Sequence, residues 1–290
     1  MPNIKNIKTK LDSASNMKQL FNSMECSDSD RLKKLNKQIS TYQTFMWDFF
    51  NIVWSVWSLF FGSTSIDSNK KKLFLVYSSN KWLCWSSNDK LFKKIVSSYW
   101  ENKDNIDIYC IWKKAFEFFA KKWFNVVWYL KLSDTFVQED LSDVYEYIVS
   151  SIANNIYWEI AVYSNFLKNK VSSKSINYNL YPVDQDSLYL FMDSIWLNKE
   201  CLCSSFEDAS LLWSSNEMKK EIERQLIQHI LYWVALQNKL SELSTRVSLI
   251  QSMKNSTDFV VKDLRLSFNR VCQSLLTREI SSIMELKSTY

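Results

Sequence analysis

The chain has 290 residues, of which 47% are hydrophobic and 23% are charged, and its formal net charge is +5. This balance excludes a disordered chain and an ordinary membrane protein, and the spread of the positive charges is typical of a solvated surface rather than a nucleic-acid-binding one. Two counts are unusual, since the chain has one glycine and 13 tryptophans. Glycine adopts positive φ angles cheaply. Either the fold avoids such turns, or this is not the sequence that the cell makes.

Residues 1–62 are predicted to form a coiled-coil helix. After a polar interruption at Asp28, apolar residues recur at alternating spacings of three and four from Leu32 to Phe60, which is the pattern of a coiled-coil seam. A helix of this length would extend about 85 Å, too far for a compact domain. Gly62 follows the last seam residue, at a position that favours glycine at a helix end.

The apolar stretch at 45–61 is about long enough to cross a membrane. Asp48 and Asn51 interrupt it, and it continues the seam of the helix before it. We therefore interpret it as part of the coiled coil. A coiled-coil scaffold tethered to a membrane by this stretch is kept as an alternative.

Residues 63–204 are predicted to form a Rossmann-like α/β domain. The β-rich runs "KLFLVYSS", "DIYCIW", "NVVWYL" and "EIAVYSNF" alternate with helix-like segments at 88–100, 113–122 and 139–154. This alternation is typical of a mostly parallel sheet flanked by helices. Residues 170–204 are predicted to be irregular, with Pro182 preceding a helix and "CLC" in a loop or strand.

The strand–turn–helix at the start of this domain invites a comparison with nucleotide-binding folds. Neither G-x-G-x-x-G nor G-x-x-x-x-G-K-[ST] is present, and these are the motifs by which such turns bind phosphates. An α/β enzyme that binds a nucleotide or small molecule and dimerises through helical arms is therefore only an alternative. A chain of that kind should bind nucleotide on its own.

Residues 205–290 are predicted to form a second coiled-coil helix. Apolar residues step by three and four from Leu226 to Ile250, and the seam resumes at Leu264 after the polar run "KNSTD". A lone amphipathic helix cannot bury its own stripe. Two such seams at opposite ends of the chain therefore predict an antiparallel helix pair.

No catalytic, cofactor-binding or metal site is predicted. The six cysteines contain no C-x-x-C pair, and His229 is the only histidine, so the usual ligands for zinc or for nucleophilic catalysis are poorly represented. The acidic residues between Asp134 and Asp143 precede a helix, where they suit the positive end of its dipole.

The C-terminal helix matches a family pattern that runs approximately S-E-x-x-x-R-x-x-A-M-x-N-A-T-D and then L-x-L-x-Y-N-x-x-R-Q-x-x-I-T-x-E-I. The matching residues are Ser241, Glu242, Arg246, Met253, Asn255, Thr257, Asp258, Leu264, Leu266, Phe268, Asn269, Gln273, Thr277, Glu279 and Ile280. On these residues the chain resembles the γ subunit of F-type ATP synthases, the central rotor shaft. The resemblance extends over nearly the whole chain and is weakest over residues 18–60.

The turn after the first predicted strand resembles the family motif S-D-x-G-L-C-G-x-x-N. Ser79, Leu83, Cys84 and Asn88 are in register with it, and its two glycines fall on Trp82 and Trp85. Trp112 and Trp123 also fall where family motifs carry glycine. Together with the near absence of glycine, this suggests a reassigned codon, UGA, read as glycine by the cell and rendered as tryptophan in the sequence.

The resemblance implies a non-catalytic subunit that uses no cofactor, nucleic acid or small-molecule substrate. Its helix pair would insert into the hexameric ring of α and β subunits. Its α/β domain would bind the ε subunit and the membrane ring of c subunits. The protein would then be peripheral to the membrane, on the cytoplasmic face of the cell membrane.

The resemblance also implies which residues contact the ring. These are Met24, Arg246, Met253, Asp258, Asn269, Gln273, Thr277 and Glu279. The chain departs from the family at Cys272, where the pattern has the arginine that precedes Gln273. One polar contact with the ring is therefore in doubt.

Overall fold

The structure is a computed structural model that describes residues 4–60, 70–79, 85–169, 172–183, 185–195 and 216–288. It contains two compact units: a helix-pair unit (Met1–Arg31 with Arg246–Tyr290) and an α/β unit (Leu32–Thr245). The two longest helices, α1 (Ile4–Phe60) and α7 (Asn216–Ser288), contribute residues to both units. The long terminal helices predicted from the apolar spacing are confirmed.

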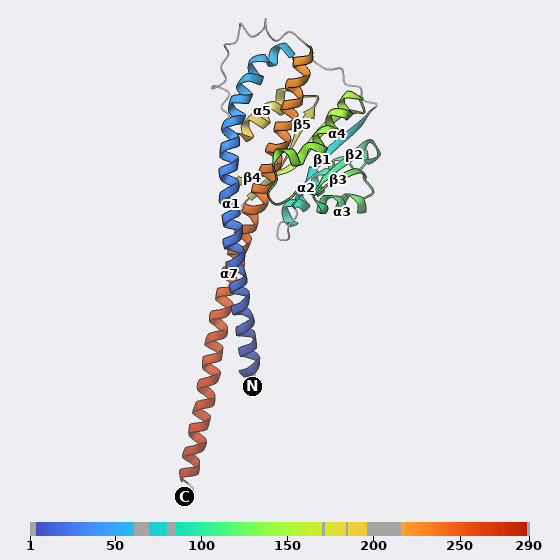
Figure 1. The fold of residues 1–290 in the computed structure, drawn as a ribbon. Coiled ribbons are helices and arrows are strands. Elements are labelled where there is room, and N and C mark those ends of the chain that lie inside the picture. The colour runs from blue at the N-terminus through green and yellow to red at the C-terminus, as the bar shows by residue number, and fades with distance from the viewer. Residues whose placement is uncertain are drawn as a thin grey trace. The chain divides into compact units, whose positions relative to one another are not determined.

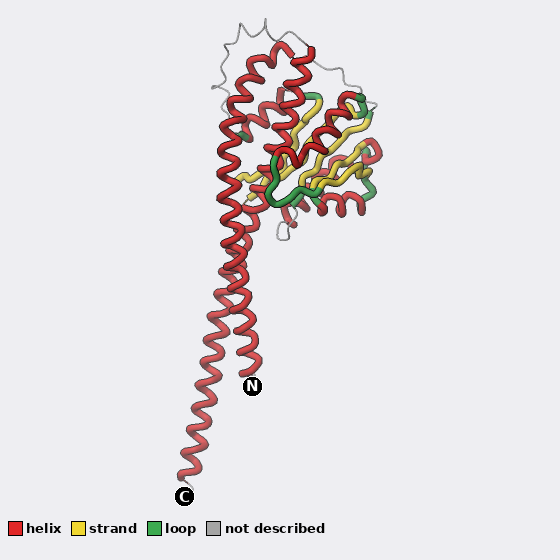
Figure 2. Tube along the Cα trace, in the orientation of Figure 1, coloured by secondary structure: helices red, strands yellow, loops and turns green. Residues whose placement is uncertain are grey.

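A five-stranded sheet lies at the centre of the α/β unit, in the order β3-β2-β1-β4-β5 (Figures 1 and 2). Its strands are β1 (Lys71–Tyr77), β2 (Ile106–Ile111), β3 (Asn125–Leu130), β4 (Tyr157–Asn169) and β5 (Ser172–Tyr181). The pairs β1–β2, β1–β4 and β2–β3 are parallel, and β4–β5 is antiparallel. The predicted α/β fold with a mostly parallel sheet is confirmed.

The central strand β1 is buried on both faces of the sheet. Leu73, Leu75 and Tyr77 belong to one core cluster, and Phe74 and Val76 belong to the other, because successive side chains of a strand point to opposite faces. Burial on both faces is typical of parallel sheets and produces continuous apolar runs. The run "KLFLVY" is therefore a consequence of its central position.

Helices cover both faces of the sheet. The shorter ones are α2 (Trp85–Tyr99), α3 (Lys113–Lys121), α4 (Ser142–Ala153) and α5 (Gln185–Ser194). Side chains of α2 and α3 pack in the cluster that contains Phe74. Side chains of α4 and α5, with parts of α1 and α7, pack in the cluster that contains Leu73. The first three shorter helices agree with the predicted segments at 88–100, 113–122 and 139–154.

The prediction that residues 170–204 are irregular is wrong for 172–181, which form β5, whereas the helix predicted after Pro182 is confirmed by α5 at 185–194. The sequence "SSKSINYNLY" of β5 has many polar residues, which masks its alternation. Tyr178 and Leu180 face the core, while the intervening residues are more exposed. The apolar alternation covers only the end of the strand that lies over the core, so composition alone obscured it.

Most of the apolar stretch at 45–61 belongs to α1, where Met46, Phe50 and Val53 are buried in the core of the α/β unit. Packing against the protein's own core explains the hydrophobicity at these three positions, whereas Phe45, Trp47 and Ile52 of the same stretch are exposed. Within the described residues, none of the helices combines the length and hydrophobicity needed to cross a membrane.

His229 of α7 lies among aromatic side chains of α1. Its Nδ1 is 2.7 Å from the hydroxyl oxygen of Tyr42, and its ring centroid is 4.9 Å from that of Phe45 and 4.8 Å from that of Phe49. Burial among these rings lowers the pKa of His229 to about 4, because a charged imidazolium is poorly solvated there. The side chain is a neutral packing residue.

This lowered pKa predicts a loss of stability in mild acid. An unfolded histidine takes up a proton near pH 6.5, whereas folded His229 does so only near its pKa of about 4. The unfolded state therefore binds more protons between these values, and the free energy of unfolding falls as pH drops through that window. In His229→Gln this loss should be smaller, as measured by urea unfolding at several pH values. An equal loss in both proteins would contradict the assignment.

Candidate partner-binding surface of the paired helices

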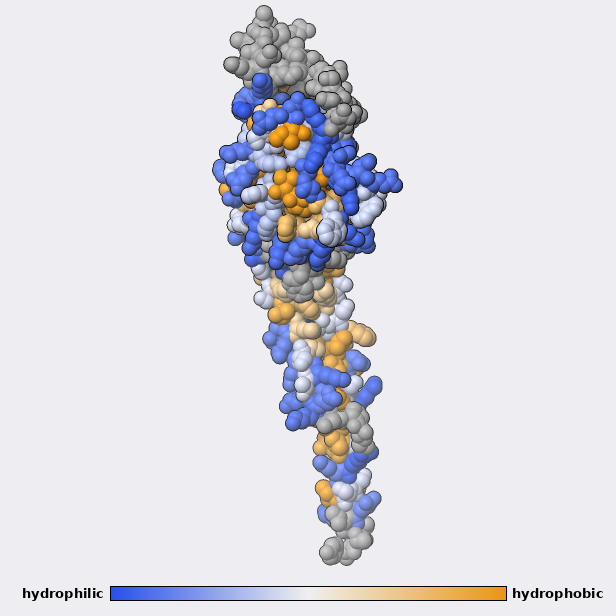
Figure 3. All heavy atoms as spheres, turned by 90° about the vertical axis from the view of Figure 1, so that its right-hand side faces the viewer, coloured by the Kyte–Doolittle hydropathy of each residue, from blue (hydrophilic) through white to orange (hydrophobic). Residues whose placement is uncertain are grey.

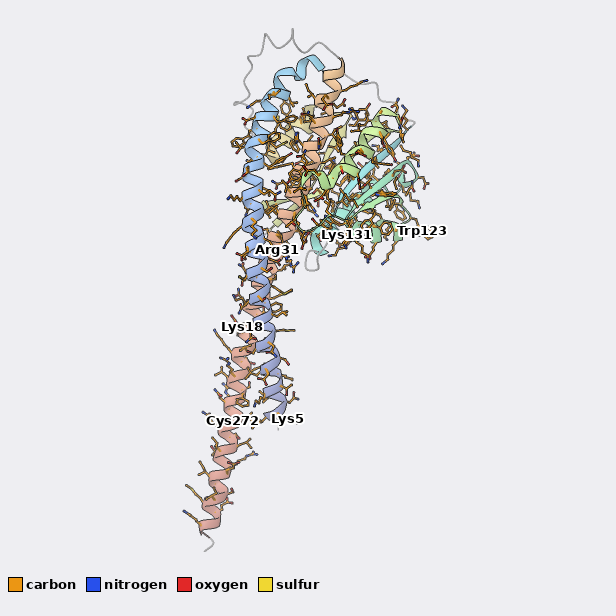
Figure 4. All side chains as sticks on the ribbon, viewed as in Figure 1. Lys5, Lys18, Arg31, Trp123, Lys131 and Cys272 are labelled. Carbon is orange, nitrogen blue, oxygen red and sulfur yellow. The ribbon has the colours of Figure 1, made fainter. Side chains whose placement is uncertain are left out.

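In the helix-pair unit, α1 and α7 run antiparallel. Ion pairs between them are Lys18–Asp258 at 2.6 Å, Glu25–Lys254 at 2.9 Å and Asp28–Arg246 at 2.8 Å. Residue numbers thus rise along one helix as they fall along the other, and Figure 4 shows Lys5 and Cys272 at matching heights on the two helices. The predicted antiparallel coiled coil is confirmed.

One ion pair of this unit is buried. Asp28 is 2% exposed and Arg246 is 7% exposed, and Arg246 Nε lies 2.8 Å from Asp28 Oδ2. The N–H is not aligned with that oxygen for a hydrogen bond, so the contact is an ion pair rather than a charge-assisted hydrogen bond. Arg31 Nη1 lies 3.6 Å from the other carboxylate oxygen. A polar layer in an apolar seam is a known means of specifying helix register.

The other two ion pairs lie nearer to solvent. A hydrogen bond from Lys254 lowers the pKa of Glu25, and the adjacent ammonium group of Lys18 lowers the pKa of Asp258. Exposed pairs of this kind contribute little to stability, because water screens them and the side chains lose freedom. Asp258, a predicted ring contact, is thus engaged within the pair of helices.

The C-terminal part of α7 exposes large apolar side chains, here called the α7 apolar surface. They are Phe259, Val260, Leu266, Leu275, Leu276, Ile280, Ile283 and Met284. Phe259 is 75% exposed, and Figure 3 shows apolar side chains uncovered along this part of the helix. Phe259, Leu266, Leu276, Ile280, Ile283 and Met284 fall on one side of the helix, and exposed apolar surface of this kind marks a site that another molecule covers.

The predicted ring contacts fall into two groups in the structure. Asn269, Gln273, Thr277 and Glu279 are exposed on the same stretch of α7 as the α7 apolar surface. Gln273 lies seven residues from both Leu266 and Ile280, so these three share one helix face.

The remaining predicted contacts are less accessible. Met24, Met253 and Asp258 are half-buried, and Arg246 is buried against Asp28. Cys272 is half-buried. A sequence signal for the burial of Arg246 did exist. Asp28 lies within the apolar seam of α1, and a charge buried there needs an oppositely charged partner on the other helix.

The other candidate site is the crevice at the carboxyl ends of the parallel strands, where open α/β sheets bind ligands. In this chain α7 occupies that crevice, since Asn238 Nδ2 donates to the carbonyl oxygen of Ser78 at 3.0 Å. Ser79 and Asn88 of the turn motif bond to each other, with Asn88 Nδ2 2.8 Å from Ser79 Oγ. The remaining cavity is about 10 Å³, room for about one water.

Further polar groups near this crevice are also engaged. Ser78 Oγ accepts a hydrogen bond from the backbone N–H of Ala115 in the first turn of α3, a group that binds anions in nucleotide-binding folds. Lys239 of α7 is buried and its Nζ lies 3.0 Å from Asp134 and 3.6 Å from Glu242. The described residues therefore leave no room for a nucleotide here. Residues 82–84 of the turn motif lie outside the described residues, and Trp85 begins α2.

Comparisons with known proteins agree with this geometry. A family model described as ATP synthase matches residues 3–285. The chain is 24% identical to the ATP synthase gamma chain of Mycoplasma mycoides and 25% identical to that of Fusobacterium nucleatum, with 98% of each chain covered. The chain belongs to the ATP synthase gamma-chain family. It is a central-stalk subunit of F-type ATP synthase and not a catalytic one.

Solved structures of ATP synthase rotors and central stalks share the fold of this chain. The rotor of the Euglena gracilis mitochondrial ATP synthase aligns with a TM-score of 0.63 at 12% identity, over 94% of this chain and 98% of that one. A central stalk from Tetrahymena thermophila mitochondrial ATP synthase aligns with a TM-score of 0.56 at 11% identity, over 81% and 99%. At these identities the likeness concerns the fold alone.

Removal of Asp28 is expected to destabilise the helix pair strongly. In Asp28→Ala, the buried Arg246 loses its partner, which should lower the free energy of unfolding by about 3–5 kcal/mol. The double variant Asp28→Ala/Arg246→Ala should lose less than the sum of the two single variants. Urea unfolding followed by circular dichroism measures the free energy of unfolding of each variant. Lys18→Ala is the matched control, because its solvent-exposed ion pair should contribute far less to stability than the buried pair.

The filled crevice predicts that the isolated chain does not bind nucleotide. Isothermal titration of the purified chain with ATP and with ADP should give no saturable heat. A nucleotide site in the α/β unit would instead give a one-to-one isotherm, and would revive the enzyme alternative.

Proposed function

We propose that this central-stalk subunit is a rotor whose α7 apolar surface contacts the catalytic ring of an F-type ATP synthase. The single observation that carries the proposal is the row of large apolar side chains on α7 that the described residues leave uncovered. The predicted contacts Asn269, Gln273, Thr277 and Glu279 are exposed on the same stretch. Apolar anchors with polar neighbours are the usual composition of a protein–protein interface.

The partners follow from the family. The chain would insert α7 into a hexameric ring of α and β subunits, and its α/β unit would bind the ε subunit and the membrane ring of c subunits. Related folds come from assemblies described as OSCP, F1 and c-ring, and as a rotor. The subunit would then be a peripheral protein on the cytoplasmic face of the cell membrane.

The mechanism rests on the asymmetry of α7. Its faces differ, since Leu276 and Ile280 lie on one side while the exposed Ser274 lies on the opposite side. Catalytic subunits around such a shaft would each meet a different face. Because a contact that favours one conformation shifts the equilibrium towards it, each catalytic subunit would be biased to a different nucleotide affinity. Rotation driven by ion flow would then change which subunit releases ATP.

Co-expression with the α and β subunits from the same source tests this role. The chain should be recovered with the ring at one copy per six ring subunits. Leu276→Asp/Ile280→Asp should weaken recovery at least about tenfold, because two charges would replace apolar contacts. Ser97→Asp/Ser98→Asp, at exposed positions of α2 in the α/β unit, is the matched control. A chain that does not associate with the ring, or a double variant that binds like the control, would contradict the proposal.

A further inference from the structure

Two tryptophans have a backbone conformation that is costly for a bulky residue. Among the described residues, φ is positive at Trp112 (79°), Trp123 (61°) and Asn155 (54°). Asparagine is tolerated in this region because its short polar side chain bonds locally, whereas a large side chain there is an outlier. Each tryptophan therefore needs a reason to be held in this conformation.

At Trp123 the reason is the end of α3. The backbone N–H of Trp123 donates to the carbonyl oxygen of Ala120 at 3.3 Å, and that of Phe124 donates to Phe119 at 3.3 Å. These two bonds are those of a Schellman motif, whose left-handed residue is usually glycine. The hydrophobic contact that accompanies the motif is present too, since the rings of Phe119 and Phe124 are 5.6 Å apart. The local structure requires the positive φ at Trp123.

The end of α4 provides an internal comparison. There the N–H of Asn155 donates to Ile152 at 3.0 Å, and the N–H of Ile156 donates to Ser151 at 3.0 Å. This is the same motif, and asparagine occupies the left-handed position. The chain thus forms the motif twice, once with a residue suited to it and once with tryptophan.

At Trp112 the conformation is more demanding still. Its φ of 79° and ψ of 145° lie beside a region that is populated essentially by glycine. The residue joins the end of β2 to the start of α3, and its N–H donates to the carbonyl oxygen of Leu130 at 2.8 Å. The strand pairing on one side and the helix on the other determine this conformation.

The side chain of Trp123 gains little from packing. It is 83% exposed, and Figure 4 shows it at the rim of the α/β unit next to α3. An exposed indole contributes little burial energy to offset the backbone strain. The chain as a whole has one glycine and 13 tryptophans, so tryptophan stands at positions where glycine is both needed and missing.

We propose that positions 112 and 123 are glycine in the protein that the cell makes. The codon at both positions is UGA, which the source cell decodes as glycine and which the written sequence renders as tryptophan. The exposed indole of Trp123 then marks no partner surface, because it is absent from the working protein.

The gene and the native protein test the proposal directly. Both codons should be UGA, and peptide sequencing by mass spectrometry of the subunit purified from its source cells should give glycine at 112 and 123. UGG at either codon, or tryptophan in either native peptide, would overturn it.

A recombinant comparison tests the structural reason separately. Trp123→Gly should raise the thermal midpoint by about 2–4 °C, because the left-handed strain disappears. Trp123→Ala should gain less, since alanine keeps the steric penalty of a Cβ atom. Trp128→Gly, at an exposed position in β3, is the matched control and should lower the midpoint because glycine weakens a strand. A Trp123→Gly variant no more stable than Trp123→Ala would overturn the argument.

Discussion

The structure depends on the fact that neither terminal helix can bury its apolar stripe alone. In the helix-pair unit, α1 and α7 supply each other's partner, and the Asp28–Arg246 pair sits inside that seam. A buried ion pair adds little net stability compared with apolar packing, because desolvation offsets the attraction. The pair instead disfavours other registers of the two helices, because a shift of register would leave both charges buried and unpaired. We interpret this pair as the element that fixes which residues of the two helices face each other.

The same requirement explains how α7 fills the crevice at the strand ends of this Rossmann-like sheet. In nucleotide-binding relatives of this fold, the crevice at the strand ends is open. In the α/β unit, α7 lies in that crevice and satisfies its polar groups, as the bond from Asn238 to the carbonyl oxygen of Ser78 illustrates. A helix in this position occupies the crevice where a ligand would bind, and its polar side chains hydrogen-bond to the ends of the strands. The fold thus supplies a rigid attachment for a helix rather than a reaction centre.

Much of the fold could be predicted because the relevant signals are local and periodic. The seams of α1 and α7 and the apolar run of β1 follow from spacing within short windows. β5 was missed although Ile176, Tyr178 and Leu180 alternate with Asn177 and Asn179, because the polar residues before them dominate the composition of the strand. The burial of Arg246 was also missed, since it depends on the pairing of two helices distant in sequence. The exposed group from Asn269 to Glu279 came from family resemblance and not from physical reasoning.

Backbone geometry carries information about residue identity that side-chain chemistry does not. A buried tryptophan can be rationalised in almost any core, so packing is a weak test of whether it belongs there. A left-handed helix end is a strong test, because the hydrogen bonds of the motif fix φ whatever the side chain is. The two ends at Trp123 and Asn155 share these bonds, yet only one carries a residue that tolerates the conformation. The discrepancy therefore lies in the residue written at that position and not in the fold, which is the same at both ends.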